Sequence, residues 1–178
     1  MKYCSRLAVL VFCFVSALSV AGQAKSVWKE FSPEGGNFRI DLPGVPTFSE
    51  KMRAYELMTD FLQYKVSFLP TKVPVQPENP TLMKVFWDNF VKKMETGEGI
   101  KAIEQADFRS GNAYGREVTF EQGELILVNR YLYSGETFYV LITATYKENS
   151  SAAQIKADRS KFHTSFSFLD KVGGSKAQ

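Results

Sequence analysis

Residues 114–146 read YGREVTFEQGELILVNRYLYSGETFYVLITATY, and this stretch decides the fold. Three runs rich in β-branched and aromatic residues, at 114–121, 125–133 and 137–146, are separated by short turns that contain glycine. Short glycine-containing links between such runs are typical of β-hairpins. A similar run at 101–108 precedes them across a Ser-Gly-Asn turn, so the pattern predicts an antiparallel meander of four strands.

The last predicted strand is apolar on both of its faces. Phe138, Val140 and Ile142 alternate along one face, while Tyr139 and Leu141 occupy the other. A sheet that is apolar on both faces needs cover on both sides. We therefore expect one layer of structure on each side of the meander.

Two predicted helices can supply these layers. The first spans 80–95, where Asn79 suits the N-cap and Pro80 the first helical position. Its apolar stripe repeats at helical spacing and consists of Leu82, Met83, Phe86, Trp87, Phe90, Val91 and Met94. The second begins at Ser150 or Ser151 and ends near His163. Its core positions are Ala152, Ile155, Phe162 and the stem of Arg159.

Upstream of the first helix the sequence predicts another group of strands. These strands are expected at 28–31, 38–42, 50–58 and 61–69. Phe38, Ile40 and Leu42 alternate with charged residues, which is the period of a half-buried strand. Two strand regions, each followed by one helix, predict an α+β fold in which an antiparallel sheet is flanked by two helices.

This order of elements resembles the Mog1/PsbP-like fold, an α/β/α sandwich. The opening Trp28-x-x-Phe-x-Pro-Glu-Gly-Gly-x-Phe-x-Ile-x-Leu-Pro-Gly-x-Pro46 resembles the start of PsbP-like proteins and of a group of uncharacterised secreted bacterial proteins. In that group Gly-x-x-x-Gly-Arg-Glu-Val is followed by two strands and a Phe-x-x-Ser-Phe ending, which this chain has at 111–118 and 162–166. The resemblance implies the fold and a secreted location. PsbP itself is a non-enzymatic accessory of a membrane complex, but the sequence shows no motif for its docking or metal-binding residues.

The first 24 residues have the parts of a secretory signal, namely a basic start, an apolar run and small residues before a cut. Cleavage after Ala24 is expected, and cleavage after Gly22 is the near alternative. A retained membrane anchor is the competing interpretation. A spanning helix needs roughly 20 apolar residues, and the apolar run from Leu7 to Val20 is shorter than this. We therefore predict a cleaved leader at 1–24, a single domain at 25–169 and a disordered tail at 170–178. The chain is expected to be exported, to the periplasm or outside the cell.

Composition excludes several kinds of chemistry. Both cysteines, Cys4 and Cys13, lie in the leader, and His163 is the only histidine. The exported chain therefore has no thiol nucleophile, disulfide or cysteine-based metal site, and we expect no cofactor and no metal. The net charge of +3 includes two basic residues of the leader, so the exported chain is close to neutral. Nucleic acid is not an expected partner, because the chain has no basic patch.

The candidate binding residues are Arg116, Arg130, Tyr131, Tyr133 and Trp87. Arg130 is a charge inside an apolar strand, and it either lies at an edge with its stem packed or anchors an anionic ligand or partner carboxylate. Arg116 and Arg130 are expected on neighbouring strands, where they can point to the same face. For the three aromatic residues, packing against the sheet is favoured over a ligand platform.

His163 and a group of glutamates are the remaining catalytic candidates, and neither is favoured. His163 lies at the end of the predicted second helix, so a capping or surface role is favoured over catalysis. Glu117 and Glu121 are about 13 Å apart along one strand, which exceeds the separation of a glycosidase pair. With Glu124 they are interpreted as the solvated rim of a hairpin.

These observations favour a secreted, non-enzymatic binding or accessory module that acts on a protein or an envelope component. The alternative is an extracytoplasmic protein that binds a small molecule or a lipid between sheet and helix. A third hypothesis is a hydrolase that uses carboxylates without a metal. The oligomeric state does not follow from the sequence.

Overall fold

The computed structural model describes residues 27–71, 79–96, 99–111 and 113–169. The predicted leader and the predicted tail lie outside the described residues. Within those residues, no helix is long and apolar enough to cross a membrane.

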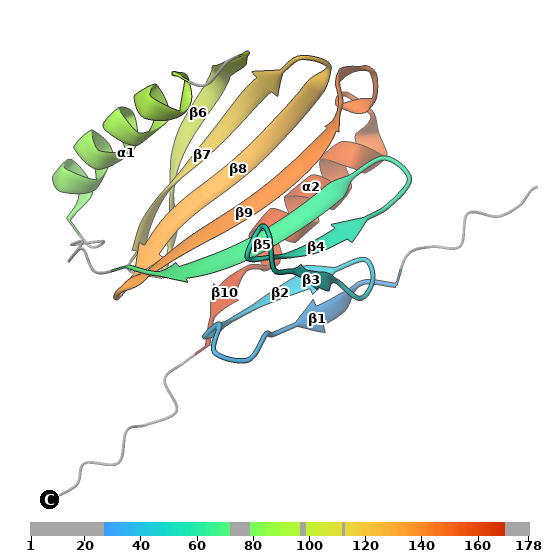
Figure 1. The fold of residues 1–178 in the computed structure, drawn as a ribbon, viewed down its shortest axis with the longest axis horizontal. Helices are drawn as coiled ribbons and strands as arrows, with labels where there is room; N and C mark the ends of the chain where they lie inside the picture. Colours follow the sequence, from blue (N-terminus) through green and yellow to red (C-terminus); the bar gives the residue numbers. More distant parts are fainter. Residues whose placement is uncertain (1–26, 72–78, 97–98, 112, 170–178) are drawn as a thin grey trace, which may run out of the picture.

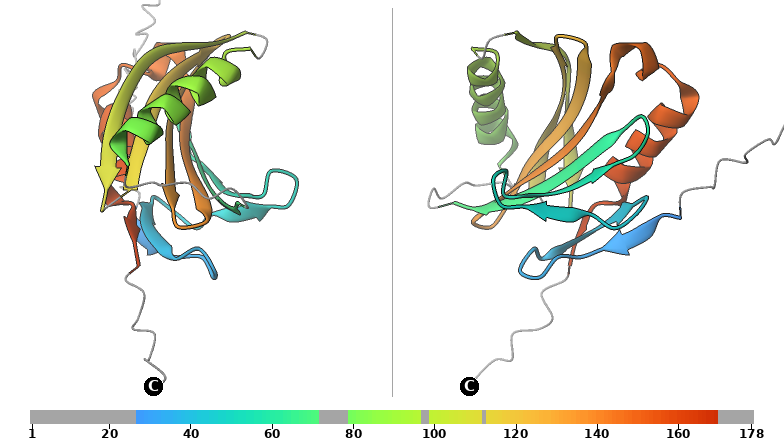
Figure 2. Two further views of the ribbon diagram at one scale, coloured as in Figure 1. Left: turned by 90° about the vertical axis from the view of Figure 1, so that its left-hand side faces the viewer. Right: turned by 45° about the vertical axis from the view of Figure 1, so that its right-hand side comes forward.

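A seven-stranded antiparallel sheet forms the middle layer of the molecule, and it is strongly twisted (Figures 1 and 2). Its strands are, in sheet order, β3 (Thr47–Ser49), β4 (Ala54–Met58), β5 (Gln63–Pro70), β9 (Thr137–Tyr146), β8 (Leu125–Ser134), β7 (Ala113–Gln122) and β6 (Ile100–Ser110). The predicted four-strand meander is confirmed as β6 to β9. Because β5 pairs with β9, the two predicted strand regions join into one sheet.

The predicted strand at 50–58 is wrong in its first half. The structure instead has a hairpin of β3 and β4, and a turn separates the two strands at residues 50–53. Arg53 in this turn has a φ of 50°, in the left-handed region, which a continuous strand does not allow. The short strand β3 ends one edge of the sheet, and β6 ends the other.

A second, three-stranded sheet lies beside the first. Its strands are β1 (Lys29–Phe31), β2 (Phe38–Leu42) and β10 (Ser167–Phe168), with β2 in the centre. The strand β10 follows the second helix and was not predicted. Its pairing with β2, extended by a bond from the Leu169 amide to the Asn37 carbonyl, joins the two ends of the described chain.

The two main helices, α1 (Pro80–Met94) and α2 (Ala153–Ser165), lie on opposite faces of the large sheet (Figure 2). As predicted, α1 begins after Asn79, whose side chain accepts a hydrogen bond from the Leu82 amide at 3.1 Å. α2 begins later than predicted, because a short 3₁₀ turn (Lys147–Asn149) intervenes. The Ser150 hydroxyl bonds to the Lys147 carbonyl at 2.7 Å instead of capping α2.

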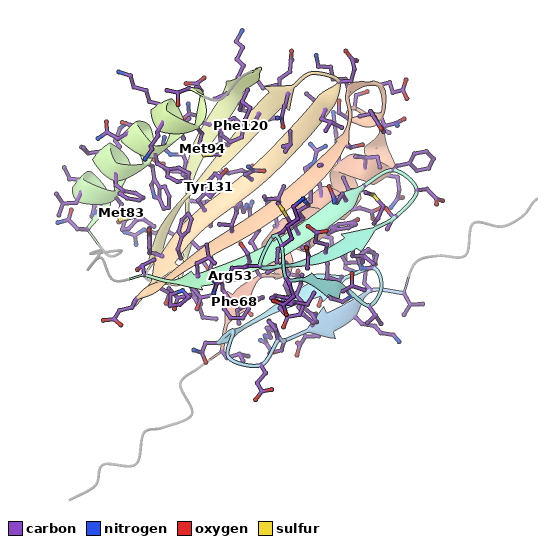
Figure 3. All side chains as sticks on the ribbon, in the orientation of Figure 1. Arg53, Phe68, Met83, Met94, Phe120 and Tyr131 are labelled. Atoms are coloured by element: carbon purple, nitrogen blue, oxygen red, sulfur yellow. The ribbon has the colours of Figure 1, made fainter. Side chains whose placement is uncertain are left out.

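Two apolar cores fill the spaces between these layers, as the two-faced strand pattern predicts. The core under α1 contains Met83, Trp87, Val91, Val118, Phe120, Tyr131 and Tyr133, and Figure 3 labels several of these residues with the neighbouring Met94. The core between the sheet, α2 and the small sheet contains Phe38, Ile40, Leu42, Leu62, Tyr64, Val66, Leu132, Tyr139, Leu141, Ile155, Phe162 and Phe166. Strand β8 contributes Tyr131 and Tyr133 to the first core and Leu132 to the second, and this alternation fixes its register.

Gly115 allows the β6–β7 hairpin to pack closely. A methyl group at this position would overlap the ring of Phe108 and lie 2.8 Å from the carbonyl oxygen of Tyr131. Phe108 therefore lies directly over the backbone of β7, and the guanidinium of Arg130 lies 4.9 Å from the centre of its ring. In this way the hairpin positions Arg130.

Candidate functional site

Arg116 and Arg130 point to opposite faces of the sheet, so the expectation that they share a face is wrong. In the register of β7 and β8, Arg116 lies opposite Tyr131, on the face covered by α1. Arg130 lies opposite Glu117, on the face covered by α2. Because side chains alternate along a strand, the one-residue offset between Arg116 and Glu117 separates the two arginines.

Arg116 anchors α1 to the edge of the sheet. Its Nε donates to the Asp107 carboxylate, its Nη1 donates to Gln105 Oε1 at 2.9 Å, and both terminal nitrogens donate to Asp88 Oδ1 at 3.0 Å. Hydrogen bonds from Lys84 and then Arg116 lower the pKa of Asp88. Each nitrogen of this guanidinium already binds an acceptor, and the side chain is 5% exposed. Arg116 therefore connects α1 to β6 inside the protein.

Trp87, Tyr131 and Tyr133 are core residues under α1, as the packing interpretation predicts. All three are buried, and the Trp87 ring stacks against both tyrosine rings, with centroids 6.2 and 6.0 Å apart. The Tyr131 hydroxyl accepts a hydrogen bond from Asn129 Nδ2 at 2.6 Å. Burial raises the pKa of Tyr131 to about 12. The two tyrosine rings are closed to a ligand while α1 is in place.

Arg130 is the centre of a polar cluster under α2. Its Nε donates to Glu117 Oε2 at 2.5 Å, and its Nη1 donates to the main-chain carbonyl of His163 at 2.7 Å. Nη2 makes no hydrogen bond with the residues that the structure describes. We call the group Glu117, Arg130, Thr143, Arg159 and His163 the arginine–histidine cluster.

His163 is buried, and the expected capping or surface role is wrong. Its side chain is 2% exposed, with Nδ1 at 3.7 Å from Glu117 Oε2 and Nε2 at 3.4 Å from Thr143 Oγ1. α2 continues to Ser165, so His163 lies within its last turn and faces the sheet. Burial, and then the charges of Arg130 and Arg159, hold the pKa of His163 well below its usual range. The imidazole is therefore neutral at pH 7.

The arginine–histidine cluster carries an excess of positive charge. Arg130 and Arg159 are both cationic, and Glu117 supplies the carboxylate that faces them. Burial lowers the pKa of Arg159, although the charge of Glu117 acts in the opposite direction. The Nε and Nη2 atoms of Arg159 are buried and have no hydrogen-bond partner among the described residues. Buried polar groups are usually paired, so the cluster retains unused donors.

A cavity of about 210 Å³ adjoins the cluster at the C-terminal end of α2. Its walls are Phe108, Arg109, Ser110, Arg130, Leu141, His163, Thr164 and Phe166. A second cavity, of about 280 Å³, lies under the first turns of α1 and is lined by Pro80, Thr81, Met83, Lys84, Trp87, Asp107, Tyr114 and Gly115. The two cavities differ in charge. Asp107 lines the cavity under α1, whereas the walls of the cavity beside Arg130 contain no acidic residue.

The series Thr143–His163–Glu117 has the order of a hydroxyl, an imidazole and a carboxylate in a hydrolase triad. Its separations of 3.4 and 3.7 Å exceed those of good hydrogen bonds. Thr143 is also 1% exposed, so its hydroxyl has no route to a substrate in this conformation. Among the described residues, no three His, Cys, Asp or Glu side chains gather as metal ligands.

Part of the sheet face on the α1 side is not covered by α1. The helix packs over β6, β7 and β8 and reaches Phe138 and Val140 of β9, whereas β5 and β4 lie beyond it (Figure 1). We call the α1-facing side of β9, β5 and β4 the open face. At one end of it Met58 and Tyr146 are 66% and 59% exposed, and the neighbouring Phe61 is 52% exposed.

Sequence reasoning missed Glu117, Arg159 and His163 as partners of Arg130. Glu117 directly follows Arg116 in the Gly-x-x-x-Gly-Arg-Glu-Val motif, but its partner depends on the strand register. Arg159 and His163 are four residues apart on α2 and therefore share a helix face. That four-residue spacing is the one local signal in the sequence that places Arg159 and His163 together on the same side of α2.

Comparisons with known proteins identify the fold. No protein-family model matches this chain, and no curated protein matches it. A solved structure of cyanobacterial PsbP (CyanoP) from Synechocystis is similar over 85% of this chain and 98% of that chain, with a TM-score of 0.59 and 9% identity. A protein of unknown function from Pseudomonas aeruginosa aligns with 75% of this chain and 92% of its own, at 11% identity and a TM-score of 0.42. The first similarity, together with the two helices around an antiparallel sheet, shows that this chain has a PsbP-like α+β fold.

Proposed function

We propose that this chain is an exported, non-enzymatic accessory module that binds a partner protein through the open face. The observation that carries the proposal is the group of exposed apolar residues Met58, Phe61 and Tyr146 at the end of that face. Exposed apolar patches with a polar rim mark interaction sites on soluble proteins. The resemblance to PsbP-like proteins supports an accessory role, and the predicted leader supports export.

The three residues belong to one surface. Met58 pairs with Gln63 of β5, which in turn pairs with Ala144 of β9, two residues before Tyr146. The main-chain carbonyl of Phe61 accepts a hydrogen bond from the Thr145 hydroxyl at 2.6 Å, which holds it beside the end of β9. The patch therefore combines side chains from three neighbouring segments of the sheet.

The charge of the open face indicates the chemistry of the partner. Lys65 and Glu56 lie next to each other on this face, with Nζ and Oε1 at 3.1 Å, and their side chains are 22% and 26% exposed. Since the two charges neutralise each other, the face offers little attraction to a charged surface. We therefore propose a protein partner whose contact surface is apolar and aromatic.

Ion pairing of the carboxylates supports binding over hydrolysis. Glu117 is paired with Arg130, and Glu121 is paired with Lys147 at 2.9 Å. A hydrolase that uses carboxylates needs one of them as a protonated acid or as a free base. Both of these carboxylates instead bind a cationic side chain of the same chain.

Site-specific photo-crosslinking in the organism that makes the protein tests this proposal. A photoreactive residue replaces Phe61 on the open face or, as a matched control, Val85, which is 56% exposed on α1. We expect a crosslinked protein at position 61 but not at position 85. The variant Tyr146→Glu is expected to abolish that crosslink, because it places a charge in the apolar contact.

Several results would overturn the proposal. A crosslink only to lipid, only to a second copy of this chain, or to the same proteins from both positions contradicts a specific partner protein at the open face. Failure to obtain any crosslink from position 61 contradicts it as well. Turnover of a hydrolase substrate by the purified chain at an enzyme-like rate would contradict the non-enzymatic role.

A further inference from the structure

We propose that the cavity beside Arg130 is a binding site for a small carboxylate with an aromatic or branched apolar body. This cavity lies on the opposite face of the sheet from the open face, so the inference does not depend on the proposed partner protein. The cavity is bounded by the end of β6, the middle of β8 and β9, and the C-terminal end of α2.

Arg130 provides the group that recognises the carboxylate. Its Nε and Nη1 are held by Glu117 and by the His163 carbonyl, while Nη2 has no protein acceptor among the described residues. The side chain is 21% exposed, and the ring of Phe108 supports its guanidinium plane from one side. A guanidinium fixed in this way has already lost its conformational freedom, which lowers the cost of binding an anion.

The charges around the cavity favour an anion. Two guanidinium groups face one carboxylate in the arginine–histidine cluster, so the cluster beside the cavity keeps an excess of positive charge. The walls contain no acidic side chain that would repel a second carboxylate. Arg116 provides the contrast, because Asp88, Asp107 and Gln105 already occupy its donors.

The remaining walls determine the rest of the ligand. Phe108, Leu141 and Phe166 present apolar surface, and Ser110 and Thr164 add hydroxyl groups at the cavity. The volume of the cavity is about 210 Å³. It is smaller than the 300–1,000 Å³ that is typical of sites for drug-sized ligands. A small carboxylate with one ring or one branched chain matches this size and these walls.

Binding of benzoate to the purified exported chain tests the inference. In two-dimensional NMR spectra we expect benzoate to shift the signals of Phe108, Leu141 and Phe166, with a dissociation constant at or below about 1 mM. Benzamide has the same shape without the charge and is expected to bind at least tenfold more weakly. Acetate has the charge without the ring and is expected to bind at least tenfold more weakly as well.

Three variants separate the cavity from non-specific attraction. Arg130→Gln is expected to abolish benzoate binding. Ser110→Phe fills the cavity while Arg130 remains, so it is expected to abolish binding even if Arg130→Gln does not fold. Arg53→Gln removes an exposed cation in the β3–β4 turn and serves as the matched control, with binding unchanged.

The inference is overturned if benzamide or acetate binds as tightly as benzoate. It is also overturned if benzoate shifts signals of the open face rather than of the cavity, or if Ser110→Phe binds benzoate normally. None of these results bears on the crosslinking experiment, because Phe61 and Tyr146 remain unchanged in every variant. Failure of the two proposals is therefore distinguishable.

Discussion

At Arg116 each guanidinium nitrogen binds an acceptor, and the side chain is 5% exposed. At Arg130 two nitrogens bind protein acceptors and the side chain adjoins a cavity. The difference arises from the neighbours that each side of the sheet provides. α1 and β6 bring two carboxylates to Arg116, whereas Arg130 shares one carboxylate with a cluster that contains a second arginine.

His163 should make the stability of the protein depend on pH. Its pKa in the folded protein is well below 6.5, the value expected in the unfolded chain, so the unfolded state takes up the proton first as pH falls. The contribution of the neutral imidazole is complete above about pH 6.5 and is lost as pH falls toward the native pKa. Denaturant unfolding between pH 8 and 5 should show this loss, at up to about 1.4 kcal/mol per pH unit.

The variant His163→Gln is the control for this prediction. Because His163 is the only histidine, the variant should remove the part of the pH dependence that begins near pH 6.5. NMR titration of the single imidazole provides a direct check, and its midpoint should lie well below 6.5. An ordinary midpoint, or the same pH dependence in the variant, would contradict a neutral histidine among Glu117, Arg130 and Arg159.

At the scale of elements, α1 is held by an apolar stripe and by one ion-pair network around the buried Arg116. Trp87 and its neighbours bury the stripe, while Arg116 joins Asp88 of α1 to Asp107 and Gln105 of β6. This network connects a helix to the edge strand of the sheet. It orients α1 along β6 and β7, and β5 and β4 are left outside its reach (Figure 1).

Arg116→Ala should therefore destabilise the protein by about 1.5–3 kcal/mol, the range for lost hydrogen bonds to charged groups. The matched control is Lys84→Ala, which breaks the exposed pair of Lys84 and Asp88 and should cost less than about 1 kcal/mol. Urea unfolding followed by tryptophan fluorescence measures the free energy of unfolding of both variants. Equal effects of the two variants would contradict the role of Arg116 as the anchor of α1.

At the scale of the whole molecule, two cores share one sheet. β8 and β9 have neighbours on both sides and contribute side chains to both cores, whereas β3 is a short edge strand. Local opening requires little loss of packing at an edge and much loss at the centre. We therefore infer that the centre of the sheet is the most stable part of the structure.

Native-state hydrogen exchange should show this gradient of stability. Amides of β8 and β9 that pair within the sheet are expected to exchange through global unfolding. Amides of β3 should exchange through local opening at much lower free energy. Exchange rates at increasing, sub-denaturing urea concentrations distinguish the amides that exchange through global unfolding from those that exchange through local opening. Protection of β3 equal to that of β8 would contradict the inferred gradient.

Several elements were predictable because their signals are local. The cap at Asn79, the proline at the first helical position and the apolar spacing placed α1 correctly. The glycine turns placed β6 to β9 within two residues of their observed ends. The hairpin of β3 and β4 was missed because its turn contains no glycine or proline. β10 was missed because two residues carry no period and exist as a strand only beside β2.

The candidate site was predictable only in part. Arg130 stands out as a charge in an apolar strand, and the stem of Arg159 falls on the apolar side of the second helix. Glu117 and His163, by contrast, look like ordinary surface residues in the sequence. Their common position depends on the register of β7 against β8 and on which face of the sheet receives α2. A shift of one residue in that register moves every side chain of a strand to the opposite face.

The sequence by itself determined the α+β class, the four-strand meander, the first helix and the need for cover on both faces of the sheet. These follow from residue periodicity, caps and turns, which act within about ten residues. Only the tertiary structure decided that Arg116 is saturated while Arg130 retains a donor, and that His163 is buried and neutral. Register, helix placement and burial bring together groups that are 13 to 46 positions apart in the chain, and no local pattern encodes that proximity.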